Sequence, residues 1–153
     1  MTYLKSAGPK PDSCVFCEAL AENDDAKNLI VHRGQHCFVI LNLFPYSNGH
    51  LMVVPFAHVD SVEGMTLESL SEMMALSQHG LGVLRAAYSP QAFNLGINIG
   101  GPAGAGVPGH VHLHLVPRWG GDTNFMSVLA NTRVIPEALS QTYERLCALW
   151  LQE

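Results

Sequence analysis

Three histidines alternate with apolar residues in the segment His110-Val111-His112-Leu113-His114. In an extended strand, alternate side chains point to the same face, so this spacing predicts that the three imidazoles project together. An imidazole can bind a metal, move a proton or act as a nucleophile. Each ring also needs partners for two nitrogens, which makes three histidines a costly way to fill a core. The motif therefore indicates a functional site.

Two kinds of site fit this spacing better than an exposed polar strand, which has no reason to choose histidine three times. A His-x-His pair can share one Zn²⁺. The outer two, His110 and His114, would lie roughly 13 Å apart at ~3.3 Å per residue, so all three cannot reach one ion. At least one histidine is then left for other work, such as nucleophilic catalysis.

A glycine-rich stretch over residues 98–109 leads directly into the histidine strand. Successive backbone N–H groups in such a loop form anion-binding concavities. Amides could hold the equatorial oxygens of a phosphate while an imidazole attacks phosphorus. The loop is a weak signal alone, but joined to the histidine motif it predicts phosphate chemistry.

The chain has four cysteines, and two of them form a CxxC pair, Cys14 and Cys17. In a reducing compartment such a pair is more often half of a zinc site or a redox pair than a structural disulfide. Cys37 and Cys147 stand in apolar settings and are expected to be ordinary buried cysteines.

The hydrophobic pattern predicts one α+β domain over residues 14–153, preceded by a flexible segment over 1–13. Thr66 is the expected N-cap of a long helix over 66–87, and Pro136 the expected first residue of a C-terminal helix. The expected sheet is mostly antiparallel and five-stranded, with strands Leu29–His32, Cys37–Asn42, His50–Pro55, Phe93–Ile99 and His110–Arg118.

The composition and net charge of the chain limit the classes of partner that it can bind. The chain has 153 residues, is 48% hydrophobic and carries a net charge of −5, so no global basic field attracts nucleic acid. An anionic substrate must be held by local donors. No apolar stretch is long enough to span a bilayer and no signal peptide is evident, so we expect a cytoplasmic protein without a membrane partner. The charged fraction of 14% is low, which favours burial of surface in a homo-oligomer.

The segment His110–Val116 resembles the signature of the histidine-triad (HIT) superfamily of nucleotide hydrolases and transferases. The resemblance extends to the CxxC pair, to Leu41-Asn42 and to the segment Gly49–Pro55. The segments Leu41–Tyr46 and Pro117–Phe125 are most similar to the bacterial diadenosine tetraphosphate (Ap4A) phosphorylase branch, in which inorganic phosphate cleaves the dinucleotide. The resemblance implies a HIT-like fold, an adenine nucleotide substrate and a homodimer or larger homo-oligomer.

The same resemblance implies a role for each histidine. His112 matches the nucleophile that attacks the α-phosphorus and becomes nucleotidylated. His114 matches a phosphate contact, and His110 a structural position or zinc ligand. In a zinc-bearing subset, a structural Zn²⁺ is held at the positions of Cys14, Cys17, His58 and His110.

Positions for the nucleotide are also implied. Asn42 matches the residue that hydrogen-bonds a ribose hydroxyl, and Asn98 a residue of the phosphate loop. For His50 we favour a structural hydrogen-bonding role. The remaining matches are apolar walls around the base (Phe16, Ile40 and Leu43) and backbone positions of the phosphate loop (Gly104, Ala105, Gly106 and Val107).

One departure from the family pattern concerns the leaving group. Many members carry Gln or Ser three or four residues before the first histidine, as a phosphate ligand and proton donor, whereas this chain has Gly106 and Val107. An ADP or ATP leaving group needs a proton less than an amine does, which favours polyphosphate cleavage over phosphoramidate hydrolysis. Phosphate and water both remain as acceptors.

Two other classes of protein remain as alternatives. In a zinc hydrolase, His112 would itself bind the metal and a chelator would stop activity at once. A nucleotide-binding protein with little turnover would bind AMP without cleaving the dinucleotide.

Overall fold

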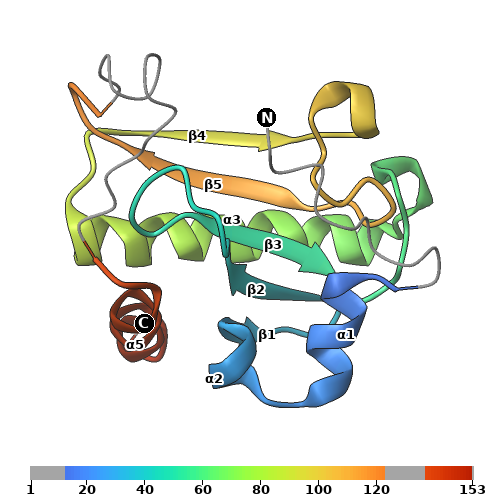
Figure 1. The fold of residues 1–153 in the computed structure, drawn as a ribbon, viewed down its shortest axis with the longest axis horizontal. Helices are drawn as coiled ribbons and strands as arrows, with labels where there is room; N and C mark the ends of the chain where they lie inside the picture. Colours follow the sequence, from blue (N-terminus) through green and yellow to red (C-terminus); the bar gives the residue numbers. More distant parts are fainter. Residues whose placement is uncertain (1–12, 123–136, 153) are drawn as a thin grey trace.

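The structure is a computed structural model that describes residues 13–122 and 137–152. Five strands form one antiparallel sheet in the order β1-β2-β3-β5-β4. The strands are β1 (Ile30–Arg33), β2 (Cys37–Leu41), β3 (Leu51–Pro55), β4 (Ala92–Ile97) and β5 (Leu113–Arg118). The predicted α+β class with a five-stranded antiparallel sheet is confirmed (Figure 1).

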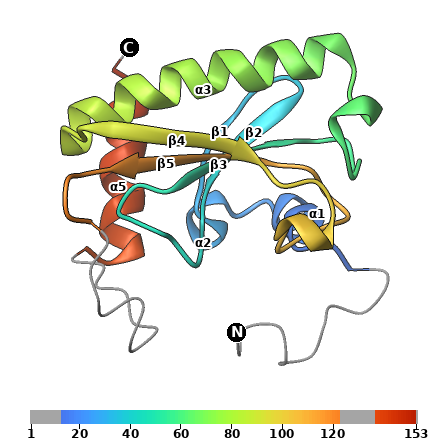
Figure 2. The same cartoon turned by 90° about the horizontal axis from the view of Figure 1, so that it is seen from above.

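Helices cover both faces of this sheet (Figure 2). The long α3 (Leu67–Tyr88) lies along one face, and the C-terminal α5 (Leu139–Trp150) packs against α3 and β1. Two short helices, α1 (Val15–Glu22) and α2 (Asp25–Asn28), lie on the opposite face. Two 3₁₀ turns, η2 (Val62–Gly64) and η3 (Gly101–Ala103), complete the described elements.

Each face of the sheet has its own core, and the period of two along the strands separates them. In β2, Val39 and Leu41 join Met73 and Leu84 of α3. The alternate residues of β2 and β3 join Phe16 of α1 on the other face. Because both faces are covered, every residue of β2 and β3 is buried, and their sequences read as unbroken apolar runs.

Several predicted boundaries were wrong. β5 begins at Leu113, so His110 and His112 precede the paired strand instead of lying within it. Ladder pairing to β3 starts only at Val53↔Leu113, whereas Val111 N–H donates to Val59 O at 2.7 Å. The segment His110–His112, the lead-in to β5, is thus held by the loop that follows β3.

The helices also differ in part from expectation. Thr66 caps α3 by accepting a hydrogen bond from Ser69 N–H, as predicted. Two apolar residues of this helix, Leu67 and Met74, recur at helical spacing with its buried residues but are 79% and 56% exposed and lie outside the core. The C-terminal helix begins at Leu139, later than expected. Helices α1 and α2 were not predicted, and Pro136 and the proposed flexible segment up to residue 12 lie outside the described residues.

Candidate active site and metal centre

The tautomer of His112 is set by its own chain. His112 Nδ1 lies 2.8 Å from the carbonyl oxygen of His110. A carbonyl oxygen only accepts, so Nδ1 carries the hydrogen of the neutral ring and Nε2 keeps its lone pair. The residue is only 3% exposed. His112 is therefore a buried imidazole with one nucleophilic nitrogen, Nε2.

His114 is oriented from the other side through His50. Tyr46 N–H donates to His50 Nδ1 at 3.1 Å, which leaves the ring hydrogen of neutral His50 on Nε2. His50 Nε2 lies 2.9 Å from His114 Nδ1 and donates to it. His114 therefore carries its own ring hydrogen on Nε2. This Nε2–H, which is not bonded to His50, is free to donate to a ligand. The rings of His112 and His114 are in edge contact, with centroids 4.7 Å apart.

Burial keeps these rings neutral. It lowers the pKa of His112, against the opposing effect of the hydrogen bond to the His110 carbonyl. Burial and the neighbouring His112 lower the pKa of His114 to about 4. At neutral pH the pair thus offers one lone pair and one N–H donor instead of two positive charges.

His110 turns away from this pair toward the CxxC segment. Its Nε2 donates to Pro55 O at 2.9 Å, so Nδ1 keeps the lone pair. That lone pair lies 3.3 Å from Cys14 Sγ and 3.7 Å from Cys17 Sγ. Cys17 Sγ is in turn 3.4 Å from His58 Nδ1.

The ligand atoms of Cys14, Cys17, His58 and His110 all lie within 4.8 Å of one another. Two thiolates and two imidazoles form a tetrahedral zinc combination, with Zn–S of about 2.3 Å and Zn–N of about 2.0–2.1 Å. Metal-binding histidines almost always donate a hydrogen bond from the ring nitrogen that does not bind the metal, and His110 Nε2 donates such a bond to the Pro55 carbonyl. These residues fit a zinc ion, and the structure brings together the four ligands expected from the sequence.

The expected base pocket is only partly open. Phe16 and Ile40 are 4% and 7% exposed and belong to the core on the α1 face. The Phe16 ring also packs on His110 and His112, with centroids 5.4 and 5.2 Å apart. Leu43 is 61% exposed. Phe16 thus supports the histidines, and Leu43 is the one of the three that offers open surface.

Asn42 is tied into the same network. Its Oδ1 accepts a hydrogen bond from Phe44 N–H at 3.0 Å, and its Nδ2 lies 3.4 Å from both ring nitrogens of His50. The carboxamide oxygen still has a second lone pair with which to accept a ribose hydroxyl. Asn42 therefore connects the expected ribose position to His50.

Only some backbone N–H groups of the glycine loop are free to donate hydrogen bonds to a phosphate. The N–H groups of Gly104 and Ala105 donate to the carbonyls of Gly101 and Gly100. Within the described residues, the N–H groups of Gly106 and Val107 make no hydrogen bond inside the chain. Asn98 is half-buried at the start of the loop. The two free N–H groups stand where many family members carry Gln or Ser.

In the part of the chain that the structure describes, each of the five Lys and Arg side chains already has a partner. Four of its cations are ion-paired with carboxylates, and the fifth lies over an aromatic ring. The candidate donors to a bound anion here are therefore N–H groups and imidazoles. The cations are Lys27, Arg33, Arg118 and Arg145 in ion pairs, and Arg85 over Phe93.

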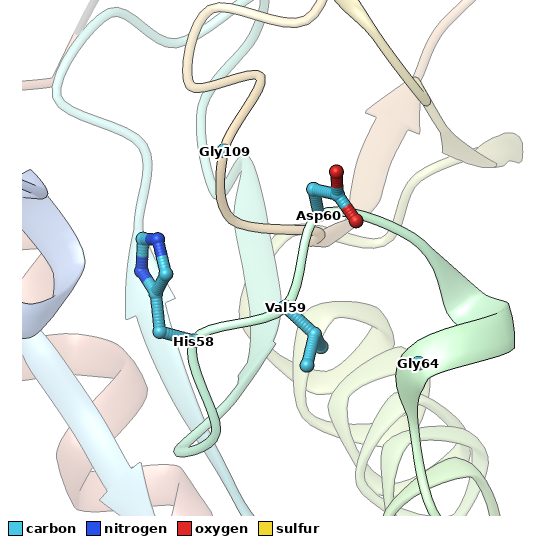
Figure 3. Close-up of a pocket in the computed structure, with 5 residues that line it drawn as sticks. All are labelled: His58, Val59, Asp60, Gly64 and Gly109. Atoms are coloured by element: carbon cyan, nitrogen blue, oxygen red, sulfur yellow. The ribbon is translucent and has the colours of Figure 1, made fainter.

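A pocket of about 390 Å³ has His58 of the metal-ligand cluster in its lining (Figure 3). It is lined by His58, Val59, Asp60, Gly64 and Gly109. Its one carboxylate, on Asp60, makes it a poor place for a polyphosphate.

Sequence reasoning missed Tyr46, and it assigned His50 only a general structural role. His50 is 0% exposed and bonded directly to His114. The signal was present in the strand pairing: β3 and β5 are antiparallel neighbours, so a histidine just before β3 falls near His114. Without the order of the strands that pairing could not be read.

Comparison with known proteins gives consistent matches. The model of the HIT domain family matches residues 23–121. An AP-4-A phosphorylase of Mycobacterium tuberculosis is 40% identical over 100% of this chain and 82% of its own length. A Zn-bound histidine triad family protein from Mycobacterium smegmatis superposes with a TM-score of 0.74 at 29% identity, covering 92% of this chain and 94% of that one. A HIT family protein from Bacillus anthracis superposes with a TM-score of 0.66 at 30% identity, covering 72% and 76%.

Proposed function

The chain belongs to the HIT domain family, and on this premise we propose that it cleaves adenine dinucleoside polyphosphates such as Ap4A at the α-phosphate. The full-length similarity to an AP-4-A phosphorylase supports this substrate class. The observation that carries the proposal is the hydrogen bond from His112 Nδ1 to His110 O, which leaves Nε2 as a nucleophile beside a neutral His114.

The first step is an in-line displacement at the α-phosphorus. His112 Nε2 forms a P–N bond as the bond from the α-phosphorus to the bridging oxygen breaks, and ATP leaves from Ap4A. The charge that develops on the imidazolium is held by the hydrogen bond from Nδ1 to the His110 carbonyl. Splitting the displacement into two such steps predicts overall retention at phosphorus.

The second step removes the nucleotidyl group from His112 and regenerates the free enzyme. Inorganic phosphate attacks the nucleotidyl-His112 to give ADP, or water attacks it to give AMP, and His112 recovers its lone pair. His114 Nε2–H and the N–H groups of Gly106 and Val107 are the donors for the non-bridging oxygens. ATP departs without needing a proton, consistent with the missing Gln or Ser donor.

Zinc is the proposed metal at Cys14, Cys17, His58 and His110. When bound, it would supply a structural cross-link and no reacting group. Protein groups then do two things: Pro55 holds the His110 ring in its metal-binding tautomer, and the His110 carbonyl orients His112.

We also propose a homo-oligomer in the cytoplasm. β4 is an edge strand on which Leu95 is 42% exposed, and Ile99 beyond it is 45% exposed. A reducing compartment would keep Cys14 and Cys17 as thiols. Within the described residues no helix is both long and apolar enough to cross a bilayer.

The test is incubation with Ap4A in the presence and absence of inorganic phosphate, with nucleotides separated by chromatography. A phosphorylase yields ADP plus ATP only with phosphate, and a hydrolase yields AMP plus ATP without it. Micromolar AMP binding with no product in either arm would show a nucleotide-binding protein and refute the proposal.

A further inference from the structure

The loop between β2 and β3 presents exposed aromatic surface next to the histidines. Phe44 and Tyr46 are 56% and 53% exposed. This loop is fixed at both ends and in its middle: Asn42 N–H donates to His50 O at 2.9 Å, and Ser47 Oγ donates to Pro117 O at 2.8 Å. Its aromatic rings are therefore held in place beside the site.

Tyr46 is the aromatic residue of this loop that contacts the hydrogen-bonded pair His50–His114. Its ring lies over His50 with centroids 4.9 Å apart and an interplanar angle of 31°. Its centroid is 6.5 Å from that of His114. Part of the ring thus covers the imidazoles, while about half of the residue remains open to a ligand.

The direction of a bound polyphosphate follows from the surrounding charges. On one side of His112 lies the Asp60 carboxylate of the pocket that His58 also lines. On the other side lies neutral His114, followed by His50 and Tyr46. The Asp60 carboxylate repels the phosphate chain from the first side, so the chain runs past His114 toward Tyr46.

A dinucleotide carries a second adenine at the far end of that chain. We propose that Tyr46 stacks the base of the leaving nucleotide and so makes the enzyme prefer dinucleotides over mononucleotide polyphosphates. The inference rests on the proposed function and adds to it a residue that determines specificity. Base–aromatic stacking is worth ~1–3 kcal/mol per base, which corresponds to roughly 5- to 150-fold in affinity.

The experiment compares kcat/KM for Ap4A and adenosine 5′-tetraphosphate, which present the same α-phosphate but differ by the second adenosine. Tyr46→Leu removes the ring, Tyr46→Met is a second variant of similar bulk, and Tyr46→Phe keeps the ring. Leu67→Ala is the matched control, because Leu67 is exposed on α3 and outside the site. Melting temperatures establish that each variant is folded.

We expect the wild-type preference for Ap4A over the tetraphosphate to fall about tenfold in Tyr46→Leu and Tyr46→Met. Tyr46→Phe and Leu67→Ala should keep that preference. Equal losses on both substrates would overturn the inference, because Tyr46 would then act only on the histidines. Turnover of neither substrate by the wild-type protein would instead refute the proposed function, and this inference with it.

Discussion

His50, His110, His112 and His114 lie close together, yet they have different tasks. His112 carries its ring hydrogen on Nδ1, whereas the other three carry it on Nε2. Backbone groups decide each case: the Pro55 carbonyl for His110, the His110 carbonyl for His112 and the Tyr46 N–H for the His50–His114 pair. Because a carbonyl or an N–H cannot reverse its role, the assignment does not depend on solvent. The division of labour among identical side chains is therefore built into the main chain.

The neutral state of His114 gives a prediction about pH. Its pKa is lowered to about 4 by burial and by His112, so in the folded protein the ring gains a proton only well below the usual pKa of about 6.5. Activity that needs a neutral His114 should persist through pH 6 and fall as the pH drops toward 4. A profile of kcat/KM for Ap4A against pH, limited to the range in which circular dichroism shows a folded protein, measures this. A loss centred at the ordinary histidine pKa would contradict it.

At the scale of elements, α3 is the long helix against which β2, β3 and β5 pack. Gly80 lies buried on its inner face, and a Cβ there would meet Leu115 Cδ2 at 3.5 Å and Trp150 Cζ3 at 3.6 Å, which is ordinary contact. Gly80→Ala should therefore raise the free energy of unfolding by about 0.5–1 kcal/mol, because alanine is the better helix former. Urea denaturation measures the change. A decrease would mean that the interface with α5 has no room for a methyl group.

The hairpin between β1 and β2 is closed by Glu72 of α3. The Glu72 carboxylate accepts hydrogen bonds from the N–H groups of Gln35 at 2.7 Å, of Cys37 at 2.6 Å, and of His36. Burial opposes the charge, but these hydrogen bonds outweigh it and lower the pKa of Glu72. The stabilisation is therefore complete above the unfolded pKa of about 4.3 and is lost as the pH falls through the lower folded value.

Glu72→Ala should reduce the free energy of unfolding by about 2–3 kcal/mol, since hydrogen bonds to charged groups contribute more than neutral ones. Glu72→Gln should lose less, because its amide oxygen can still accept. Glu68→Ala, on an exposed position one turn earlier in α3, is the control. If both alanine variants unfold at the same urea concentration, the carboxylate does not hold the hairpin.

Periodicity predicted the sheet and α3 because those elements carry apolar residues at regular spacing. It missed α1, whose N-cap is Cys14 and which contributes only Phe16 and Ala19 to the core. It also extended β5 back to His110, because alternation continues through the lead-in although pairing does not. Side-chain spacing predicts which face a residue takes, whereas the start of a strand depends on whether a neighbour is there to pair with it.

Over the whole molecule, the metal-ligand cluster joins three segments that are far apart in the sequence. Cys14 and Cys17 come from the start of α1, His58 from the loop after β3, and His110 from the lead-in to β5. The chain can be cross-linked there without a disulfide, in keeping with four free cysteines. The proposed nucleophile, His112, follows His110 by two residues, so the cluster would also hold the start of the proposed active site in place.

Metal removal tests this anchoring. We expect about one zinc per chain by elemental analysis, and a melting temperature about 10 °C lower after chelation or in Cys17→Ser, for a loss of roughly 3 kcal/mol. Cys147→Ser, outside the cluster, should keep its zinc. Activity should decline with unfolding of the site and not at the moment of chelation. Immediate loss of activity with unchanged stability would favour a zinc hydrolase instead.

The candidate site shows where sequence reasoning stops. The spacing of the histidine motif predicted a functional site, and the family resemblance supplied the zinc ligands that the structure brings together. The connection from Tyr46 through His50 to His114 depends on the pairing of β3 with β5, which no local pattern contains. Likewise, the burial of Phe16 and Ile40 follows from the position of α1, which the apolar pattern did not predict.

In the proposed mechanism, His112 Nε2 is the nucleophile. Mixing the enzyme with radiolabelled Ap4A, quenching in alkali within milliseconds and mapping the labelled peptide would locate the intermediate. We predict an acid-labile adenylyl group on His112, ATP released in a burst, and neither in His112→Asn. An adenylyl group on another residue, or turnover of His112→Asn near the wild-type rate, would contradict this role of His112.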